Sequence, residues 1–310
     1  MGVDARRREC AVSVLGGPTT VVDIAGRRIV MDPTFDPPGV HAYLTKTAGP
    51  AVTADALGPV DAVLISHDQH PDNLDNEGRR WALAAPLVLT HPGGASRLGP
   101  PAVAVAPWES YNLPGGLVAQ AVPAVHGPAD GQRDASGHVN CEVTGFVLSG
   151  PGLPTIYLSG DNASIGTVKE ISDRVGRVDI AVLFAGAASV AAKERGRPLT
   201  LTSARAAAAA ELLGATLVIP AGPCGRLGSL QRGGRGVCRR VRPGRNQRCA
   251  RACRPRGVDR LDRPEHPLTT VISFRCTGCW GRWAGAGGWT ATASVHPAGT
   301  AERRRPARWR

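Results

Sequence analysis

Short apolar runs separated by turn residues constrain the fold of this chain more than any other feature. The first three, at residues 11–15, 19–24 and 28–31, are rich in β-branched side chains and are split by Gly-Gly-Pro and Ala-Gly, which predicts a β-meander. Runs so short and so apolar are typical of strands buried on at least one face. Similar runs follow at residues 62–65, 87–90, 102–105, 118–122, 145–148, 155–158, 180–184 and 217–220.

Helical patterns alternate with the later runs. They lie at residues 76–83, 165–175 and 202–213, and the last of them opens on a Thr/Ser cap and is rich in Ala and Leu. Strands first and strand–helix alternation afterwards predict two sheets covered by helices. The sequence shows no internal repeat, and no linker precedes Ala221.

The charge of the chain is divided at one point. The formal net charge is +12, yet residues 1–221 hold 17 Lys+Arg against 21 Asp+Glu, a net of −4, and residues 222–310 hold 20 against 4, a net of +16. Two of the eight cysteines, Cys10 and Cys141, precede this point, whereas all three lysines do. Two different compositions therefore meet near residue 221.

The segment 222–310 is dense in Gly, Pro and Arg and carries no sustained apolar period. Such a composition buries too little apolar area to offset the loss of chain entropy on folding. We therefore expect one folded domain at residues 1–221 and a disordered tail at 222–310.

The sharpest cluster of polar residues lies where the apolar run 62–65 ends. Ser66-His67-Asp68-Gln69-His70-Pro71-Asp72-Asn73 places two histidines and two carboxylates directly after a predicted strand. Imidazole and carboxylate together suit zinc, manganese or iron, and a strand end is a rigid place from which to direct ligands. The simpler alternative is a solvated polar turn.

Two later strands end in the same way. Val125 is followed by His126, and Leu158 is followed by Ser-Gly and then by Asp161. Alone, His126 is an ordinary surface or core histidine, and Asp161 is an Asx turn or a helix cap. Three strand ends that each present a ligand-type residue are better explained together, as one metal site.

At these residues the chain resembles the metallo-β-lactamase superfamily, in the branch of metal-dependent hydrolases related to L-ascorbate-6-phosphate lactonase. The resemblance spans residues 10–221 and implies an α/β (α+β) fold, the αββα sandwich of two mixed sheets, here without its last helix. The matching segments are residues 15–20, 31–38, 66–73, 126, 160–162 and 217–220.

The resemblance also implies a role for each residue of the cluster. His67, His70 and His126 would hold a first divalent ion, Zn²⁺ or Mn²⁺; Asp72 would serve a second ion, and Asp161 would bridge the two. Asp32 would lie at the cleft floor. A metal-bound hydroxide would then attack a small ester, lactone or phosphoester, with Asp72 and Asp161 as the catalytic carboxylates.

The cluster departs from the usual His-x-His-x-Asp-His run of that family. It is one residue longer, with Gln69 near the second position and Asn73 in place of the last histidine. Amides are poorer ligands than imidazole. The sequence therefore leaves open whether Gln69 or His70 faces the metal, and whether one ion or two is bound.

The end of the domain also departs from the family. There, the strand at 217–220 should be followed by a histidine ligand and a Gly-Trp pair, but Ala221-Gly222-Pro223-Cys224 follows here. Codons for the residues from Pro223 onwards can be chosen so that the neighbouring frame reads histidine-alanine-aspartate-glycine-tryptophan. Our hypothesis is that a one-base insertion near codon 222 replaced the native C-terminus, which predicts impaired activity for this polypeptide.

Two other functions compete with the active hydrolase. One is a catalytically inactive metal-binding protein. The other takes the tail literally, as an Arg-rich nucleic-acid binder in which Cys249-x3-Cys253 and Cys276-x2-Cys279 form a zinc knuckle.

The partners and the cellular location follow from features that the sequence lacks. The resemblance implies a small-molecule substrate, and because the tail has no lysine we expect no specific nucleic acid. No run of about 20 apolar residues is present, and residues 1–10 lack the apolar centre of a secretory signal, so we expect no membrane partner and a cytoplasmic location. The oligomeric state stays open.

Overall fold

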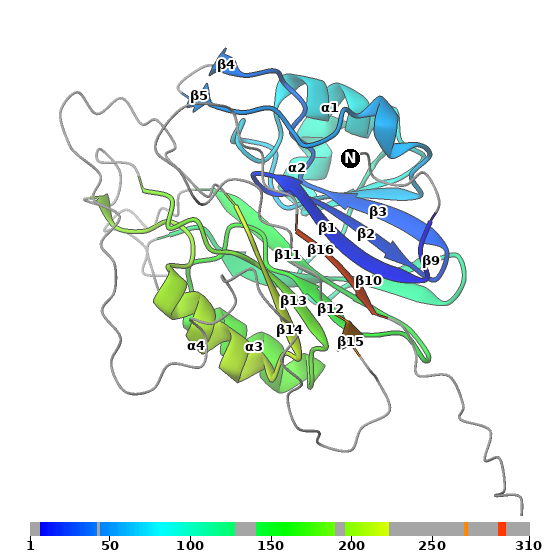
Figure 1. Ribbon diagram of the computed structural model, residues 1–310, viewed down its shortest axis with the longest axis vertical. Coiled ribbons are helices and arrows are strands. Elements are labelled where there is room, and N and C mark those ends of the chain that lie inside the picture. Colours follow the sequence, from blue (N-terminus) through cyan, green and yellow to red (C-terminus); the bar gives the residue numbers. More distant parts are fainter. Residues whose placement is uncertain are drawn as a thin grey trace, which may run out of the picture.

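Two β-sheets pack face to face, and helices cover the outer face of each (Figure 1). The computed structural model describes residues 7–41, 44–127, 141–189 and 196–222, together with the backbone of two short strands at 270–271 and 291–295. The predicted αββα architecture is therefore observed.

The first sheet combines an antiparallel meander with parallel strands. The β1–β2–β3 meander forms because Gly16 and Gly17 and the Ala25-Gly26 pair turn the chain at positive φ. Beside β3 in the sheet, β6 (Ala62–Ile65) runs parallel to it, and β7 (Val88–Thr90) and β8 (Ala102–Ala104) continue in the same direction. The described strands are, in spatial order, β15 (Thr270–Val271), β16 (Ala291–Val295), β1 (Cys10–Gly16), β2 (Thr19–Ile24), β3 (Arg27–Met31), β6 (Ala62–Ile65), β7 (Val88–Thr90) and β8 (Ala102–Ala104).

The second sheet repeats this mixture. Its first four strands in sequence pair antiparallel, and the last two add in parallel because a helix precedes each of them. The described strands are β14 (Leu217–Ala221), β13 (Ile180–Phe184), β12 (Ile156–Leu158), β11 (Glu142–Ser149), β10 (Leu117–Val125) and β9 (Ser110–Leu113), in spatial order.

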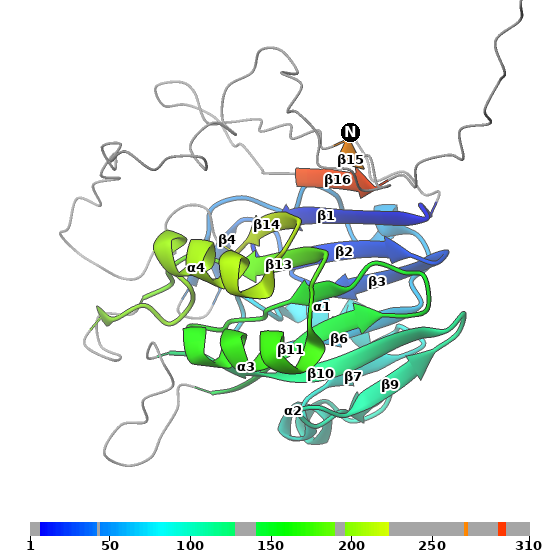
Figure 2. The same cartoon turned by 90° about the horizontal axis from the view of Figure 1, so that it is seen from below.

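Alternation along the strands divides the apolar side chains between the inner and outer layers. In β6, Leu64 faces the other sheet in the central core, whereas Val63 and Ile65 face the helices α1 (Asn76–Leu83) and α2 (Pro92–Leu98). The second sheet is covered in the same way by α3 (Ile165–Val175) and α4 (Ser203–Leu213) (Figure 2). Each helix buries one stripe, through Ala82, Leu98, Val168, Ile171, Ala209 and Leu213.

Side-chain caps begin the three predicted helices. Asp75, Ser164 and Thr202 each accept a hydrogen bond from a backbone N–H in the first turn of α1, α3 and α4. The bounds of α1 and α3 agree with the sequence prediction. None of the helices in the described part of the chain is long and apolar enough to cross a membrane.

Several elements were not predicted. The Gly-Gly pair at 93–94 hides α2, because glycine is a poor helix former, and β9 carries Tyr and Asn rather than an apolar run. A small hairpin of β4 (Gly39–His41) and β5 (Leu44–Lys46) and the 3₁₀ turn η1 (Asp55–Leu57) also lie in segments for which no element was predicted.

Two segments of the tail, which was expected to be disordered, form strands. The backbone of β16 pairs antiparallel with β1, and β15 pairs with β16, so residues 291–295 form the strand beside β1 (Figure 2). An edge strand offers free N–H and C=O groups that any extended segment can satisfy. The rest of the tail from Pro223, with the predicted disorder and the proposed zinc knuckle, lies outside the described residues. No helix follows β14 within them.

Candidate metal centre

Three predicted ligand residues meet at one edge of the sandwich. His67 follows β6 of the first sheet, and His126 and Asp161 follow β10 and β12 of the second. Asp161 Oδ2 lies 3.5 Å from Nε2 of His126 and 3.9 Å from Nε2 of His67. The amide of Thr144 on β11 donates to the carbonyl of Ser66 at 3.0 Å, which joins the two sheets beside this cluster.

The ring of His67 is oriented by a chain of buried hydrogen bonds. Ser66 Oγ donates to Asp32 Oδ2 at 2.6 Å, and the ring nitrogen Nδ1 of His67 lies 2.9 Å from the same Oγ. Since the single hydroxyl proton is donated to Asp32, Oγ accepts a hydrogen bond from Nδ1–H, and Nε2 of His67 then carries a lone pair. Burial, followed by the neighbouring histidines, holds the pKa of His67 well below its usual value, so the ring is neutral.

Asp32 directly follows β3 and accepts further hydrogen bonds in this chain. Its carboxylate also accepts the amide of Ser66 at 2.6 Å and Nδ2 of Asn73 at 3.1 Å. Burial raises the pKa of Asp32 to about 7, although the hydrogen bonds from Ser66 and Asn73 lower it. The residue expected at the cleft floor is thus fully buried, one side chain away from His67.

The ring of His126 is oriented from a distant part of the chain. Its Nδ1 lies 2.8 Å from the backbone carbonyl of Leu199. A carbonyl only accepts, so Nδ1 carries a proton, and Nε2 is the ring nitrogen that can bind a cation. The two histidines therefore direct lone pairs at the same place.

Of Gln69 and His70, between which the sequence left the choice of ligand open, His70 lies beside the other two histidines. Gln69 is exposed, whereas Nδ1 of His70 lies 3.0 Å from Nε2 of His67 and 3.2 Å from Nε2 of His126. If Nδ1 of His70 carried a proton, that one proton would face two acceptor nitrogens, Nε2 of His67 and Nε2 of His126. The three rings converge edge to face, with centroids 5.0–5.3 Å apart.

Two carboxylates accompany the histidines. Burial, and then the negative charge of Asp72, raise the pKa of Asp161 to about 8, although a hydrogen bond from Asn73 lowers it. Asn73 thus sits in the position expected for a last histidine and donates to Asp32 and Asp161 instead. Two neighbouring acidic groups favour protonation of one of them, and a cation beside them would reverse that preference.

Gly160 and Asn162 explain why Asp161 reaches this place. Gly160 has a φ of +57°, and a Cβ there would lie 2.8 Å from the carbonyl oxygen of Thr144 and 2.9 Å from the Ser66 side chain. Asn162 accepts the amide of Val125, the residue before His126, at 3.0 Å. One short turn therefore fixes both Asp161 and the strand end that carries His126.

One member of the cluster was not predicted. Cys141 precedes β11, and its Sγ lies 3.9 Å from Nδ1 of His70. The donor atoms of Cys141 and of the three histidines all lie within 4.8 Å of one another. The only sequence signal was a cysteine placed before a strand instead of after one.

The donor set fits a divalent metal. Ligand atoms 2.0–2.3 Å from a tetrahedral zinc ion lie roughly 3.3–3.7 Å apart, close to the separations among these nitrogens, sulfur and carboxylate oxygen. The lone pairs on Nε2 of His67 and of His126 are directed at the same place, which independently favours a bound cation there. His67, His70, His126 and Cys141 are therefore a group able to hold such an ion, and Asp161 lies beside it.

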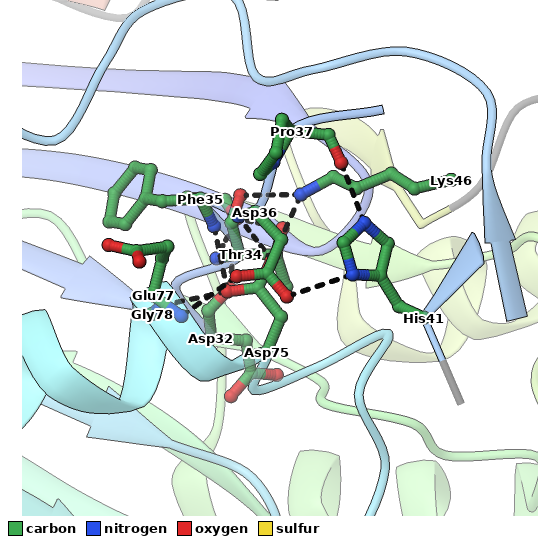
Figure 3. A network of polar contacts seen from close by, with 11 residues as sticks. Asp32, Thr34, Phe35, Asp36, Pro37, His41, Lys46, Asp75, Glu77 and Gly78 are labelled. Carbon is green, nitrogen blue, oxygen red and sulfur yellow. Dashed lines mark hydrogen bonds and ion pairs between the residues drawn. The ribbon is translucent and has the colours of Figure 1, made fainter. Parts of the chain in front are cut away.

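The loop that carries His67 and His70 is fixed at its far end by Asp75 (Figure 3). The Asp75 carboxylate accepts the amides of Phe35 at 2.9 Å, Asp36 at 2.7 Å and Gly78 at 2.7 Å, and the ammonium of Lys46 at 2.9 Å. Asp75 is thus a helix cap that also binds the segment after β3. This network was not predicted, because its partners are far apart in the sequence.

A second carboxylate extends the same network. Asp36 accepts the amide of Glu77 in the first turn of α1 and lies 3.3 Å from Nδ1 of His41 on β4 (Figure 3). Gly78 is required here, because a Cβ at that position would lie 1.8 Å from the carbonyl oxygen of Pro33. The segment after β3, the small hairpin and α1 therefore hold the ligand loop between them.

Comparison with known proteins gives one family. The family model described as the beta-lactamase superfamily domain matches residues 27–221, more than half of the chain. Among curated proteins, none matches.

Solved structures share the fold at low sequence identity. An isothiocyanate hydrolase from Delia radicum gut bacteria is 17% identical, with a TM-score of 0.58, over 71% of this chain and 88% of its own. A "possible metal-dependent hydrolase" from Veillonella parvula is 15% identical, with a TM-score of 0.57, over 68% of this chain and 85% of its own. The diiron β-hydroxylase CmlA from Streptomyces venezuelae is 18% identical, with a TM-score of 0.51, over 68% of this chain and 44% of its own.

Proposed function

Because the chain belongs to the beta-lactamase superfamily, we propose that it is a metal-dependent hydrolase whose ligands include His67, His70, His126 and Asp161. The observation that carries the proposal is the convergence of three imidazole nitrogens and one carboxylate oxygen at the meeting edge of the two sheets. Zn²⁺ or Mn²⁺ suits such a set, with Asp72 beside Asp161 available to a second ion.

The residues of the chain divide the work of hydrolysis. A bound divalent cation would lower the pKa of a water molecule towards neutrality and polarise the bond to be cleaved. Asp161 and Asp72 hold the acidic side of the centre, where a carboxylate can orient an attacking water and take up its proton. Ser66 and the Leu199 carbonyl keep the rings of His67 and His126 in the tautomers whose Nε2 lone pair can bind a cation.

For the substrate we propose a small ester, lactone or phosphoester, as in the branch related to L-ascorbate-6-phosphate lactonase. All three offer an electrophilic carbon or phosphorus that an activated water can attack. The isothiocyanate hydrolase that shares the fold adds a further carbon electrophile to the substrates that should be screened. The partner is then a small molecule rather than a nucleic acid or a membrane, and we propose a cytoplasmic location.

We further propose that residues from 222 onwards are read out of frame. The match to the family model ends at residue 221, at the point where the net charge changes from −4 to +16. The last histidine ligand of the family is then lost from this polypeptide, which weakens the second ion position and activity. Sequencing the gene across codon 222 tests this, and an unbroken frame together with peptides from the tail would refute it.

Metal analysis combined with turnover tests the function. We expect stoichiometric zinc or manganese in the purified chain, hydrolysis that a chelator abolishes, and loss of both metal and turnover in His67→Ala and Asp161→Ala. Asp173→Ala, on the exposed surface of α3, is the matched carboxylate control and should retain both. Bound metal without turnover would leave a catalytically inactive metal-binding protein, and a chain that binds no metal would refute the proposal.

A further inference from the structure

His126 directly follows β10, and Cys141 directly precedes β11, its partner strand. The last pair in the register of β10 and β11 is Val125 with Glu142, so the next step along the two chains sets His126 against Cys141. Facing residues of an antiparallel pair project their side chains to the same side of the sheet. The ladder therefore delivers a thiol to the place where β10 delivers an imidazole.

The thiol also faces the other histidines. Cys141 is buried, its Sγ lies 3.9 Å from Nδ1 of His70, and all four donor atoms fall within 4.8 Å of one another. In a tetrahedral zinc centre, sulfur and nitrogen ligands lie roughly 3.5 Å apart. A shift of a few tenths of an ångström would bring Sγ to that separation from His70.

We propose that Cys141 is a protein ligand of this centre, and that its sulfur makes the centre prefer thiophilic cations such as Zn²⁺, Co²⁺ and Cd²⁺ to Mn²⁺ and Mg²⁺. The inference rests on the proposed function, because it needs the histidine cluster to bind a metal. On binding, the Sγ–H proton leaves to solvent and a metal–sulfur bond forms, with no change of oxidation state.

The proposal narrows the choice of metal that the histidines leave open. Imidazole accepts zinc, copper, iron and nickel, and carboxylates suit manganese and magnesium, whereas thiolate discriminates against the harder cations. Asp161 lies 3.5 Å from His126, and the Cys141 sulfur lies 3.9 Å from His70, so the cluster offers a thiol as well as a carboxylate beside its imidazoles.

Cys10 provides an internal contrast. It begins β1 in the core between the sheets, where burial, followed by nearby carboxylates, raises the pKa of its thiol to about 11. No histidine of the cluster is among its described hydrogen-bonding partners. Cys10→Ser is therefore the matched control for Cys141→Ser.

The test is the absorption spectrum of the full chain titrated with Co²⁺. A Co²⁺–thiolate bond adds a charge-transfer band in the near ultraviolet, whereas tetrahedral coordination by any ligands gives visible d–d bands. We expect Cys141→Ser to lose charge-transfer intensity but to keep the d–d bands, and Cys10→Ser to keep both. Because six further cysteines follow residue 222, only intensity that depends on Cys141 counts.

The outcomes separate this inference from the function on which it rests. If d–d bands form and Cys141→Ser leaves the charge-transfer band unchanged, the sulfur ligand is refuted while the histidine site stands. If the wild-type chain binds no Co²⁺, the proposed function fails and this inference fails with it. For Zn²⁺, we expect Cys141→Ser to lower the affinity by more than the 10–100-fold typical of losing an outer-shell partner.

A measurement on the wild-type chain avoids any dependence on the folding of a variant. Alkylation of Cys141 by iodoacetamide, followed by peptide mapping, should slow markedly with Zn²⁺ or Cd²⁺ and little with Mg²⁺. The alkylation rate of Cys10 should not respond to either metal. Equal rates at Cys141 with and without Zn²⁺, in a chain that has bound Zn²⁺, would overturn the proposal.

Discussion

The two sheets supply the candidate centre in different ways. The first sheet provides one continuous loop after β6, in which His67 and His70 lie three residues apart and Asp75 closes the far end. The second sheet provides single residues from separate strand ends, His126, Cys141 and Asp161. The positions of the histidines from the first sheet depend on the contacts that fix one loop. The positions of the residues from the second sheet depend on the register of its strands.

The loop of the first sheet is the more heavily braced of the two. Its ends are bound to Asp32, to the segment after β3 and to Lys46 on the small hairpin, through buried carboxylates that accept several hydrogen bonds each. At the strand ends of the second sheet, the described residues show chiefly the side chain of Asn162, which accepts the amides of Val125 and Ser164. We therefore expect damage to the first side to cost more stability than damage to the second.

Gly78→Ala should have the largest effect. The new Cβ would meet the Pro33 carbonyl oxygen at 1.8 Å, so α1 and the segment after β3 would have to separate. We expect a loss of about 4 kcal/mol or more in the free energy of unfolding, measured by urea denaturation. Gly166→Ala, in the first turn of α3 with only ordinary contacts, is the control and should stabilise by about 0.5–1 kcal/mol. Equal effects of the two would contradict the close approach.

Asp75→Ala should come next. It removes the acceptor for the amides of Phe35 and Asp36 and the counterion of Lys46, at a site that is 4% exposed. Leaving these donors without their partner should cost about 3 kcal/mol in chemical denaturation. Ser164→Ala removes an ordinary helix cap from α3 and should cost only about 1 kcal/mol. A similar cost for both would mean that Asp75 acts as a cap alone.

Asn162→Ala tests the weaker side. The side chain oxygen accepts the amides of Val125 and Ser164, and both would lose a buried partner. We expect a loss of about 2 kcal/mol, together with weaker zinc binding by calorimetry, because His126 and Asp161 flank these contacts. Asn112→Ala on exposed β9 should change stability by less than about 0.5 kcal/mol. Unaltered zinc affinity in Asn162→Ala would argue against this role.

Asp32→Asn should cost least, about 1 kcal/mol, and should change the pH dependence instead. The pKa of Asp32 in the fold, about 7, lies above that of an unfolded aspartate, so its protonated form stabilises the fold. That contribution is complete below about pH 4 and is lost as the pH rises through about 7. With metal removed by a chelator, melting temperatures between about pH 5 and about pH 8 should fall more steeply in wild type than in Asp32→Asn. Parallel slopes would sink the assignment.

The sequence predicted the features that depend on residues close together along the chain. Apolar runs gave most strands, and the helices at 76–83 and 165–175 agree with α1 and α3 because capping residues and amphipathic stripes coincide there. The polar cluster after β6 and the residues at positions 126 and 161 follow from one rule, that strand ends present ligands. The structure brings those residues together, and their roles in binding stay a prediction.

The remaining features depend on contacts between distant segments. Asp75 before a helix predicts a cap, and nothing local indicates that Phe35, Asp36 and Lys46 share its carboxylate. Cys141 precedes its strand, so only the register with β10 sets it beside His126. The pairing of β16 with β1 likewise depends on the open edge of a sheet rather than on a sequence pattern.

The hydrogen bond from Thr144 to Ser66 crosses the seam between the two halves of the sandwich, one residue from His67. The exchange rate of the Thr144 amide proton therefore reports whether the two sheets are in contact here, whereas amide protons inside either sheet report only on that sheet. Isotope exchange at Thr144 would accelerate whenever the halves part, even while each remains folded. An ion bound by residues of both sheets would slow that exchange. The centre would then stabilise the contact between the two sheets in addition to any catalytic role.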